Sequence, residues 1–231
     1  MKKIFVVLFF VASFYSCSSD AQNAALDSKS FEAAMNSGTY QLLDVRTAGE
    51  YQSGHLKNSL QADWNNQEQF VDRIKYLDKS KPLLVYCASG VRSGNAAKYL
   101  ISIGFKTALN LEGGLNKWKY EGRAVESAGN ISQLTLDAYQ LATKKSATVL
   151  VDFGAEWCPP CKKMEPILKE IQADKSLQFT LFKVDGGNDI EVMKANQVSA
   201  LPVFIIYKNG KEVWRKQGVV EEQELKKLLL N

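Results

Sequence analysis

The run Trp157-Cys158-Pro159-Pro160-Cys161 stands where a strand-like segment gives way to a helical one. Apolar residues 149–153 precede it, and residues 164–171 carry an apolar stripe with helical spacing. A cysteine at the start of a helix is stabilised as a thiolate by unpaired backbone N–H groups and by the helix dipole. The second cysteine follows one turn later, close enough to form a disulfide with the first. This feature therefore predicts a dithiol-disulfide switch at a strand-to-helix junction.

Length and composition allow two globular domains and exclude several classes of function. The chain has 231 residues, which is room for two ordinary domains that each bury a core. Its formal net charge of +4 includes Lys2 and Lys3, so the remainder is nearly balanced and gives no reason to expect a nucleic-acid partner. The single histidine, His55, excludes a histidine-rich metal site, and the paired cysteines have no further zinc ligands at finger-like spacing. We therefore expect neither a metal nor a cofactor.

The first 17 residues are expected to direct export. Lys2 and Lys3 form a basic start, and the apolar residues 4–12 are too short to span a bilayer. A small residue directly precedes Cys17, and this segment resembles a bacterial lipoprotein signal, which implies lipidation of Cys17 and attachment to a membrane. An ordinary signal peptide, which would leave a soluble periplasmic protein, is the alternative. Either way, we expect the protein to work in the bacterial cell envelope, facing the periplasm.

Strand-like runs alternate with helical stretches and divide the rest of the chain into two units. Residues 18–27 are small and polar, as in a tether, and residues 123–131 are polar, as in a linker. The unit between them, residues 28–122, is predicted to be an α/β domain with a parallel sheet. Its strands are expected at residues 42–45, 83–86 and 107–111, and its helices at residues 30–35, 66–77 and 94–103.

The second unit, residues 132–231, contains the cysteine pair. Asn209-Gly210 is typical of a tight turn and predicts a hairpin near the end of the chain. We expect strands at residues 148–153, 179–184, 203–207 and 212–217, and helices at residues 135–143, 162–171 and 221–230.

The cysteine pair lies in a segment that resembles a known redox family. Residues 151–168 resemble the active-site segment of thioredoxin, and residues 199–202 resemble the loop that carries the cis-proline of that family. The resemblance implies a mixed sheet flanked by helices, and thiol-disulfide exchange with protein thiols and disulfides. In this interpretation Cys158 is the more exposed thiol and attacks first, forming a mixed disulfide that Cys161 resolves.

Further residues take roles from the same resemblance. Asp152 would be a buried acid that accepts the proton of Cys161, the alternative being an edge-strand aspartate that faces water. Pro202 would be cis and present backbone to a substrate, and Trp157 would pack beside the site. Leu181 stands where a lysine often accompanies the buried acid. The pair between the cysteines also departs from the family's usual one, so the direction of electron flow stays open.

Another cysteine lies in a loop between a predicted strand and a predicted helix. The loop consists of Cys87, Ala88, Ser89, Gly90, Val91 and Arg92. A loop that leaves the carboxyl end of a strand and opens a helix turns its backbone N–H groups inward and forms an anion cradle. Here the cradle would bind the substrate and hold Cys87 as a thiolate, with Arg92 bracing the bound group.

This loop resembles the active-site loop of rhodanese sulfurtransferases. The resemblance extends to residues 42–47, 50–56 and 112–118, and it implies that Cys87 takes sulfane sulfur as a persulfide from a donor such as thiosulfate. Asp44 and Arg46 would orient the loop through an ion pair, and His55 would be a packing residue. Phosphatases use a longer loop between cysteine and arginine than the four residues found here. An inactive module that only binds is the remaining alternative.

Together these features predict a membrane-tethered thiol-disulfide oxidoreductase fused to a rhodanese-like domain. In the coupled form of this hypothesis, the Cys158/Cys161 dithiol reduces a persulfide on Cys87 and releases sulfide. A membrane thiol-electron carrier would then reduce the disulfide again. Alternatively, the redox unit acts on envelope proteins while the rhodanese-like unit merely binds. A non-catalytic lipoprotein would leave the cysteine pair without a role.

Overall fold

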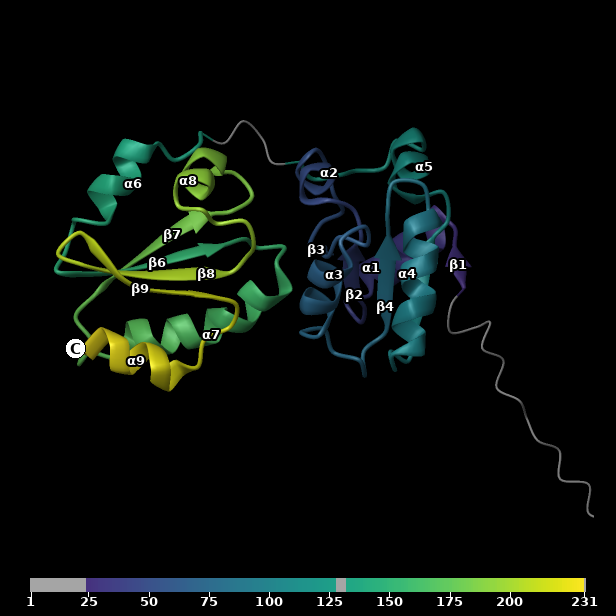
Figure 1. Cartoon of the computed structure of the whole chain (residues 1–231). Coiled ribbons are helices and arrows are strands. Elements are labelled where there is room, and N and C mark those ends of the chain that lie inside the picture. The colour runs from purple at the N-terminus through teal and green to yellow at the C-terminus, as the bar shows by residue number, and fades with distance from the viewer. Residues whose placement is uncertain (1–23, 128–131, 231) are drawn as a thin grey trace, which may run out of the picture.

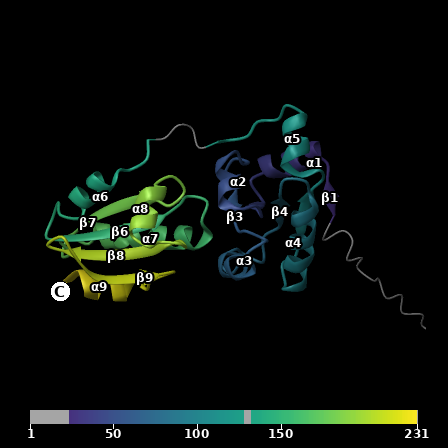
Figure 2. The same ribbon diagram turned by 45° about the horizontal axis from the view of Figure 1, so that its top comes forward.

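The computed structural model describes residues 24–127 and 132–230. Figure 1 shows two domains side by side, each built on its own sheet, and the turned view in Figure 2 shows the same arrangement. The predicted signal segment, residues 1–17, and most of the predicted tether lie outside the described residues. Within the described part of the chain, no helix combines the length and the apolar character needed to cross a membrane.

The N-terminal domain is built on a five-stranded sheet in the order β1-β5-β4-β2-β3, and all of its strand pairs are parallel. The predicted parallel α/β class is therefore confirmed, and the three predicted strands match β2, β4 and β5 within one residue. The predicted tether was wrong at its end, because Ala25 pairs with Asn110 at the edge of the sheet. The strands are β1 Ala25–Leu26, β2 Gln41–Asp44, β3 Leu60–Gln61, β4 Leu83–Tyr86 and β5 Ala108–Leu111.

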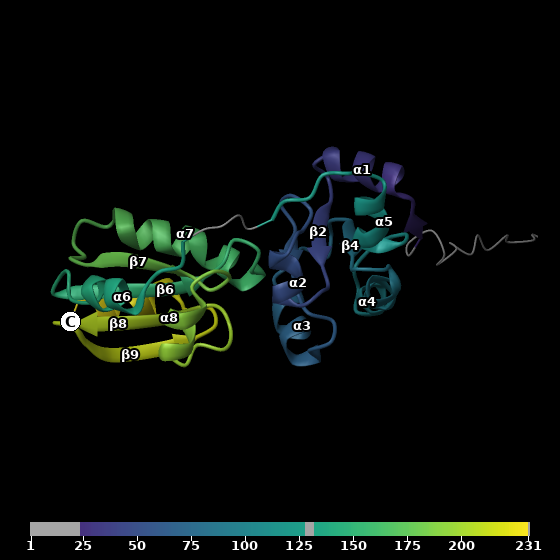
Figure 3. The same ribbon diagram turned by 90° about the horizontal axis from the view of Figure 1, so that it is seen from above.

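Helices cover both faces of this sheet, as the view in Figure 3 shows. Alternate residues of a strand point to opposite faces, so Leu83 and Val85 pack under α3 and α4, whereas Leu84 and Tyr86 pack under α1 and α5. The short α2 begins with a capping box between Thr47 and Glu50. The helices are α1 Ser28–Asn36, α2 Ala48–Gln52, α3 Gln67–Ile74, α4 Val91–Ser102 and α5 Gly114–Tyr120.

The C-terminal domain is built on a mixed four-stranded sheet in the order β7-β6-β8-β9. β6 pairs with β7 in parallel, and the other pairs are antiparallel. The predicted hairpin is present, because Asn209 and Gly210 both take positive φ angles, 49° and 75°, in the turn between the last two strands. The strands are β6 Thr148–Gly154, β7 Thr180–Asp185, β8 Val203–Lys208 and β9 Lys211–Gln217.

Two pairs of helices sandwich this second sheet. Val149 and Val151 pack with α6 and α8 on one face, and Leu150 packs with α7 and α9 on the other. All four predicted strands match within one residue, and the predicted mixed sheet flanked by helices is confirmed. The helices are α6 Leu136–Ala142, α7 Pro159–Ala173, α8 Ile190–Ala195 and α9 Glu222–Leu230.

Candidate active site

Cys158 and Cys161 form a disulfide where β6 passes into α7, with their Cα atoms 5.2 Å apart. Cys158 is the N-cap of α7 and keeps an extended backbone conformation. Pro159 and Pro160 fill the first helical positions, where the missing N–H groups cost little because those groups have no partner within a helix. The first turn of α7 therefore starts at Cys158, and its dipole favours the thiolate of this residue once the disulfide is reduced.

The two sulfurs differ in exposure, in the opposite sense to the prediction. Cys158 is 0% exposed, whereas Cys161 is 9% exposed and lines a cavity. The expectation that Cys158 is the more exposed thiol is therefore wrong for this structure. Cys158 packs in the hydrophobic cluster of the C-terminal domain, and its neighbour Trp157 contacts the N-terminal domain, which lies beside this segment (Figure 1).

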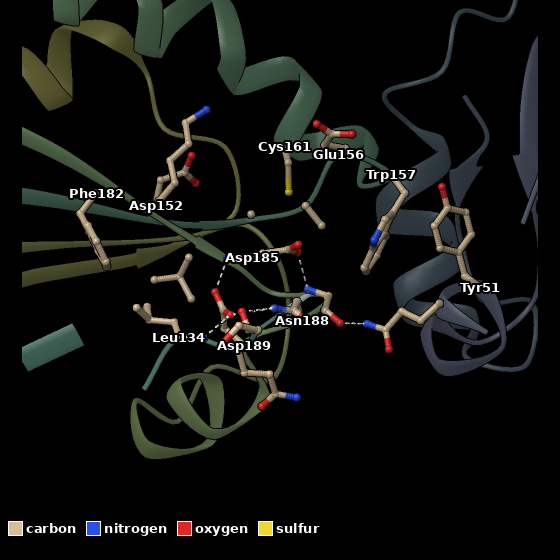
Figure 4. A pocket seen from close by; sticks show the side chains of 18 of the residues that line it. Tyr51, Leu134, Asp152, Glu156, Trp157, Cys161, Phe182, Asp185, Asn188 and Asp189 are labelled. Carbon is tan, nitrogen blue, oxygen red and sulfur yellow. Dashed lines mark hydrogen bonds between the residues drawn. The ribbon is translucent and has the colours of Figure 1, made fainter. Parts of the chain in front are cut away.

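Trp157 contacts the N-terminal domain through its backbone and its ring. The backbone N–H of Gln61, in the edge strand β3, donates to the carbonyl oxygen of Trp157 at 2.8 Å. The ring of Tyr51 lies 5.5 Å from the indole, centroid to centroid, and Figure 4 shows the two side chains turned toward each other. Nearby, the Gln52 side-chain amide donates to the carbonyl oxygen of Gly187. Trp157 was predicted to pack beside the redox pair, and it does pack against the hydrophobic cluster that contains Cys158 and Cys161. In addition, it contacts the other domain.

Arg73, on α3, completes the contact from the other side. Its guanidinium carbon lies 5.1 Å from the centre of the Trp157 ring, in cation-π geometry. The side chain is buried and donates to the backbone and side-chain oxygens of Gln61. Burial lowers the pKa of Arg73 to about 10, and the charges of Asp72 and Asp63 only partly oppose this effect. Within the described residues Arg73 forms no ion pair, so a buried positive charge without a counter-ion lies beside the redox segment.

Asp152 lies in β6 with only 9% of its surface exposed. Burial raises the pKa of its carboxyl from 3.8 to about 6, against the lowering effect of Lys183. The strand register pairs Asp152 with Lys183, and Leu181 with Leu150. The idea that Leu181 replaces a lysine beside the acid is therefore wrong, because the lysine is present two residues later. Asp152 and Cys161 line the same cavity, which fits the predicted exchange of a proton between them.

The cavity beside Cys161 is shared between the two domains and has a volume of about 970 Å³. Tyr51, Gln52 and His55 contribute to it from the N-terminal domain. Figure 4 shows the sulfur of Cys161 directed into this space, with Asp185 facing it from β7. The cavity wall therefore places a redox sulfur next to carboxylates and within reach of small molecules.

Pro202 precedes β8 and follows a cis peptide bond, as predicted. The residue is buried, and its carbonyl oxygen accepts a hydrogen bond from the N–H of Gly218 at 2.8 Å. Its neighbour Leu201 packs in the same hydrophobic cluster as Cys158 and Cys161. The loop before β8 therefore lies against the redox pair, although the present contacts leave its role in binding a substrate as a prediction.

Cys87 lies at the carboxyl end of β4 and is fully buried. Its sulfur accepts hydrogen bonds from the N–H of Gly90 at 3.1 Å and from the hydroxyl of Ser93 at 3.2 Å. Burial by itself would raise the pKa of the thiol, but hydrogen bonds from Ser93, Ser89 and Gly90 outweigh it and bring the pKa below its usual value. The loop therefore favours a thiolate, as its sequence predicts. Ser93 was not among the predicted site residues, because it follows the loop of residues 87–92 in the sequence.

The start of α5 holds this loop from behind. Gly114 approaches so closely that a Cβ atom there would lie 2.5 Å from the carbonyl oxygen of Cys87. The N–H groups of Leu115 and Asn116 donate to the carbonyl oxygens of Cys87 and Ala88 at 2.8 and 2.9 Å. These contacts give a physical reason why the segment 112–118 accompanies the cysteine loop. On the open side of the loop, Ser89 and Val91 are exposed.

Arg92 forms a two-pronged ion pair with Glu50 of α2, with N–O distances of 2.8 and 2.6 Å. The Arg92 guanidinium lowers the pKa of the Glu50 carboxyl to about 2, so this pair is charged on both sides at neutral pH. Arg92 was predicted to brace a group bound in the loop, and here α2 holds it instead. The next residues of α2, Tyr51 and Gln52, make the contacts with the C-terminal domain, so one short helix contacts both cysteine sites.

Asp44 and Arg46 form the expected ion pair, 2.6 Å apart and buried. The guanidinium also donates to the carbonyl oxygen of Gly54, which ties the end of β2 to the segment after α2. His55 stacks on Tyr51 with ring centres 3.8 Å apart, and its Nδ1 lies 3.0 Å from the carbonyl oxygen of Tyr51. This placement makes His55 a packing residue, although it also reaches the wall of the shared cavity.

The two cysteine sites are separate in this arrangement. Tyr86, Asp44 and Gln61 lie in one row across β4, β2 and β3. Neighbouring strands are about 4.8 Å apart, so about 10 Å separates the backbone at Tyr86 from that at Gln61. Cys87 follows Tyr86, and the redox segment docks at Gln61, so the width of two strands lies between the sites.

The remaining predictions for the site concern lipidation and metal binding. Cys17, the proposed lipidation site, lies outside the described residues. Among residues 24–127 and 132–230, no group of three or more His, Cys, Asp or Glu side chains is arranged to hold a metal ion.

Comparisons with known proteins agree with both halves of the chain. The family model described as Rhodanese-like domain matches residues 27–121, and the model described as Thioredoxin matches residues 130–231. Thioredoxin of Chlamydia trachomatis serovar D is 39% identical over 84 residues, which cover 36% of this chain and 81% of that protein. Thioredoxin Y, chloroplastic, of Oryza sativa subsp. japonica is 38% identical over 86 residues, or 37% of this chain, which spans about half (51%) of that relative's length.

Solved structures resemble each domain separately. A rhodanese-related protein from Thermoplasma volcanium aligns with a TM-score of 0.40 and 27% identity, covering 45% of this chain and 97% of that one. Trxlp from Edwardsiella tarda EIB202 aligns with a TM-score of 0.39 and 31% identity, covering 43% of this chain and 97% of that one.

Proposed function

The chain belongs to the thioredoxin family, with a rhodanese-like domain ahead of its thioredoxin domain, and we propose that it couples two sulfur reactions in the bacterial cell envelope. Cys87 accepts sulfane sulfur from a donor such as thiosulfate, and the Cys158/Cys161 dithiol reduces the persulfide. The observation that carries this proposal is the Cys87 sulfur, which accepts hydrogen bonds from Gly90 and Ser93 in the same chain as a redox disulfide.

The chemistry balances without a cofactor. The Cys87 thiolate takes the outer sulfur of thiosulfate, and sulfite leaves. The Cys158 thiolate then takes that sulfur from Cys87, whose thiolate leaves with the support of its hydrogen bonds. Finally, the Cys161 thiolate attacks the Sγ atom of Cys158 and expels hydrosulfide, which leaves the disulfide. Two electrons pass from the dithiol to the sulfane sulfur, and a membrane thiol-electron carrier restores the dithiol.

Sulfur transfer needs a second position of the thioredoxin domain. In the present arrangement Trp157 is docked on Gln61 of β3, two strands away from β4, the strand that leads to Cys87. Release of Trp157 from β3 would free the redox segment to reach the exposed rim of the Cys87 loop at Ser89 and Val91. Because both sites belong to one chain, their effective concentration is about millimolar when the connection permits the approach.

The envelope location rests on the leader, in which the basic Lys2 and Lys3 precede an apolar segment and Cys17. In this proposal a lipid on Cys17 holds the protein on a membrane, facing the periplasm. Expression in a bacterial host and separation of membranes test the idea. Wild type should sediment with the membranes and Cys17→Ser should not, whereas equal distribution of both would contradict a lipid anchor.

Thiosulfate loading of the full chain tests the sulfur reaction. With the Cys158–Cys161 disulfide intact, intact mass should show one added sulfur atom on the wild type and none on Cys87→Ser. Cys158→Ser should still load sulfur but should release no sulfide in a single turnover. Sulfide release that is unchanged in Cys158→Ser would refute the coupling.

A second candidate function is that the rhodanese-like domain only binds. The observations that favour it are the complete burial of Cys87 and the commitment of Arg92 to Glu50. In that case the thioredoxin domain exchanges disulfides with envelope proteins, and the other domain serves as its docking surface. Wild type that reduces a protein disulfide but never gains sulfur on Cys87 would support this candidate.

A further inference from the structure

The docked arrangement leaves one sulfur of the redox disulfide accessible, and it is that of Cys161. Cys158 is fully buried next to Trp157, which contacts the rhodanese-like domain, whereas Cys161 lines the shared cavity. Figure 4 shows the Cys161 sulfur pointing into this space. An attacking thiolate must reach a sulfur atom of the disulfide. In this form of the protein, such an attack has access to Cys161 alone.

The cavity has the size of a small-molecule site. Its volume of about 970 Å³ lies at the upper end of the range in which proteins bind small ligands. Tyr51 and Gln52 of α2 close it from the rhodanese-like domain, and Gln52 is tied to Gly187 by a hydrogen bond. The cavity is therefore large enough to admit a small thiol to Cys161.

The charge of the wall selects among small thiols. One ammonium group, that of Lys183, lines the cavity with five carboxylates, namely Asp152, Glu156, Glu165, Asp185 and Asp189. Glu165 is paired with Lys162, so four carboxylates remain against Lys183. The carboxylate of Asp152 is about nine-tenths buried and has no hydrogen-bond partner among the described residues. A cavity lined mainly by one sign of charge concentrates ligands of the opposite sign. The wall therefore favours a cationic thiol and disfavours an anionic one.

The sulfur of Cys158 is suited to be the leaving group when the disulfide is attacked. When a thiolate attacks Cys161, the S–S bond breaks and Cys158 takes the electron pair. Cys158 caps the N-terminus of α7, where the helix dipole favours negative charge. A thiol of lower pKa leaves faster.

We propose that the cavity is an access site for small cationic aminothiols, which reduce the docked disulfide by attacking Cys161 rather than Cys158. The first donor thiolate bonds to the Cys161 sulfur, and Cys158 leaves as a thiolate. A second donor thiolate attacks the sulfur of the first donor, so that the donor disulfide departs and Cys161 is released to take a proton. Two electrons pass from two donor thiols to the protein. The proposal rests on the redox pair alone and not on sulfur loading of Cys87.

The test uses the oxidised full chain in a Cys87→Ser background, so that failure of the sulfur-transfer proposal cannot affect it. Cysteamine, mercaptoethanol and mercaptopropionate are similar in size and differ in charge. For each thiol, the rate at which it reduces the protein disulfide is divided by the rate at which it reduces hydroxyethyl disulfide, a neutral small molecule. This corrected rate removes differences in intrinsic reactivity among the three thiols. We expect the corrected rate of cysteamine to exceed that of mercaptopropionate at least about tenfold. This ratio of corrected rates should fall as the salt concentration rises.

A charge-only variant tests the role of the cavity wall. Glu156→Gln with Asp185→Asn removes two exposed carboxylates and should lower the corrected ratio several-fold. Glu170→Gln with Glu221→Gln removes two exposed carboxylates elsewhere on the same domain and should leave the ratio unchanged. A corrected ratio near one for the parent protein, or an equal loss in both double variants, would overturn the proposal.

The position of the mixed disulfide decides which sulfur is attacked. Acid quenching during reduction by cysteamine freezes the exchange, and digestion at low pH followed by mass spectrometry locates the adduct. We expect cysteamine on Cys161. Cysteamine found on Cys158 would show that the thiolate attacks the Cys158 sulfur, and it would overturn the proposal.

Discussion

Replacement of Asp152 by asparagine should stabilise the oxidised protein, and the gain should depend on pH. The buried carboxyl has a pKa of about 6 in the folded chain, against a usual value of 3.8. Since the folded state raises this pKa, the contribution of the group to stability is complete below about pH 4 and is lost as pH rises through 6. At alkaline pH the carboxyl is ionised, and the difference between the two pKa values then destabilises the folded state by about 3 kcal/mol.

Asp152→Asn removes the buried charge and keeps the size of the side chain. We expect the free energy of unfolding of the thioredoxin domain to rise by about 2–3 kcal/mol at pH 8 and by less than about 1 kcal/mol at pH 4. Urea unfolding followed by hydrogen exchange in β6 and α7 reports this domain separately from the other. The exposed Asp137→Asn serves as the matched control, with a change of less than about 0.5 kcal/mol at both pH values.

The change in the free energy of unfolding at pH 8 and at pH 4 shows whether the charge of Asp152 destabilises the folded domain. An equal gain at pH 8 and pH 4 would point to an uncharged packing effect, and a loss at pH 8 would mean that the ionised carboxylate is stabilising. Either result would refute the account of Asp152 as a buried acid destabilised by its charge.

Two further predictions concern the Cys87 loop and the domain contact. Ser93→Ala removes the hydroxyl that donates to the Cys87 sulfur, so the pKa of this thiol should rise toward its usual value. Thiolate absorbance followed against pH checks this, and an unchanged midpoint would contradict it. Gln52→Glu replaces the amide that donates to the carbonyl oxygen of Gly187 by a carboxylate, which cannot donate and lies next to an acidic cavity wall. This change should weaken the contact between the domains. After reduction, alkylation of Cys158 by a bulky maleimide should become at least about tenfold faster than in the exposed control Gln223→Glu, and equal rates would mean that the contact does not cover the sulfur.

The local structure around each cysteine could be predicted because it depends on neighbouring residues. The apolar runs at residues 83–86 and 148–153 are long enough to show as buried strands, and they coincide with β4 and most of β6. The disulfide at the start of α7 follows from the spacing of its cysteines. The short elements α2, β3, α5 and α8 were missed, because two to seven residues carry too little periodicity to be recognised.

The contact between the domains could not be predicted in the same way. Gln52, Gln61 and Arg73 meet the segment of Trp157 only after both domains have folded, so no pattern within either segment signals the contact. The exposure of Cys158 was predicted wrongly for this reason. The error at Leu181 was one of register, because only the strand pairing shows that Lys183 faces Asp152.

A single turnover of the reduced chain after sulfur has been loaded on Cys87 tests whether the two sites are coupled. We expect one hydrosulfide and one new Cys158–Cys161 disulfide for each persulfide consumed, at a rate that does not depend on protein concentration. Release of hydrosulfide while both cysteines stay reduced, or a rate proportional to protein concentration, would contradict transfer between the two sites of one chain.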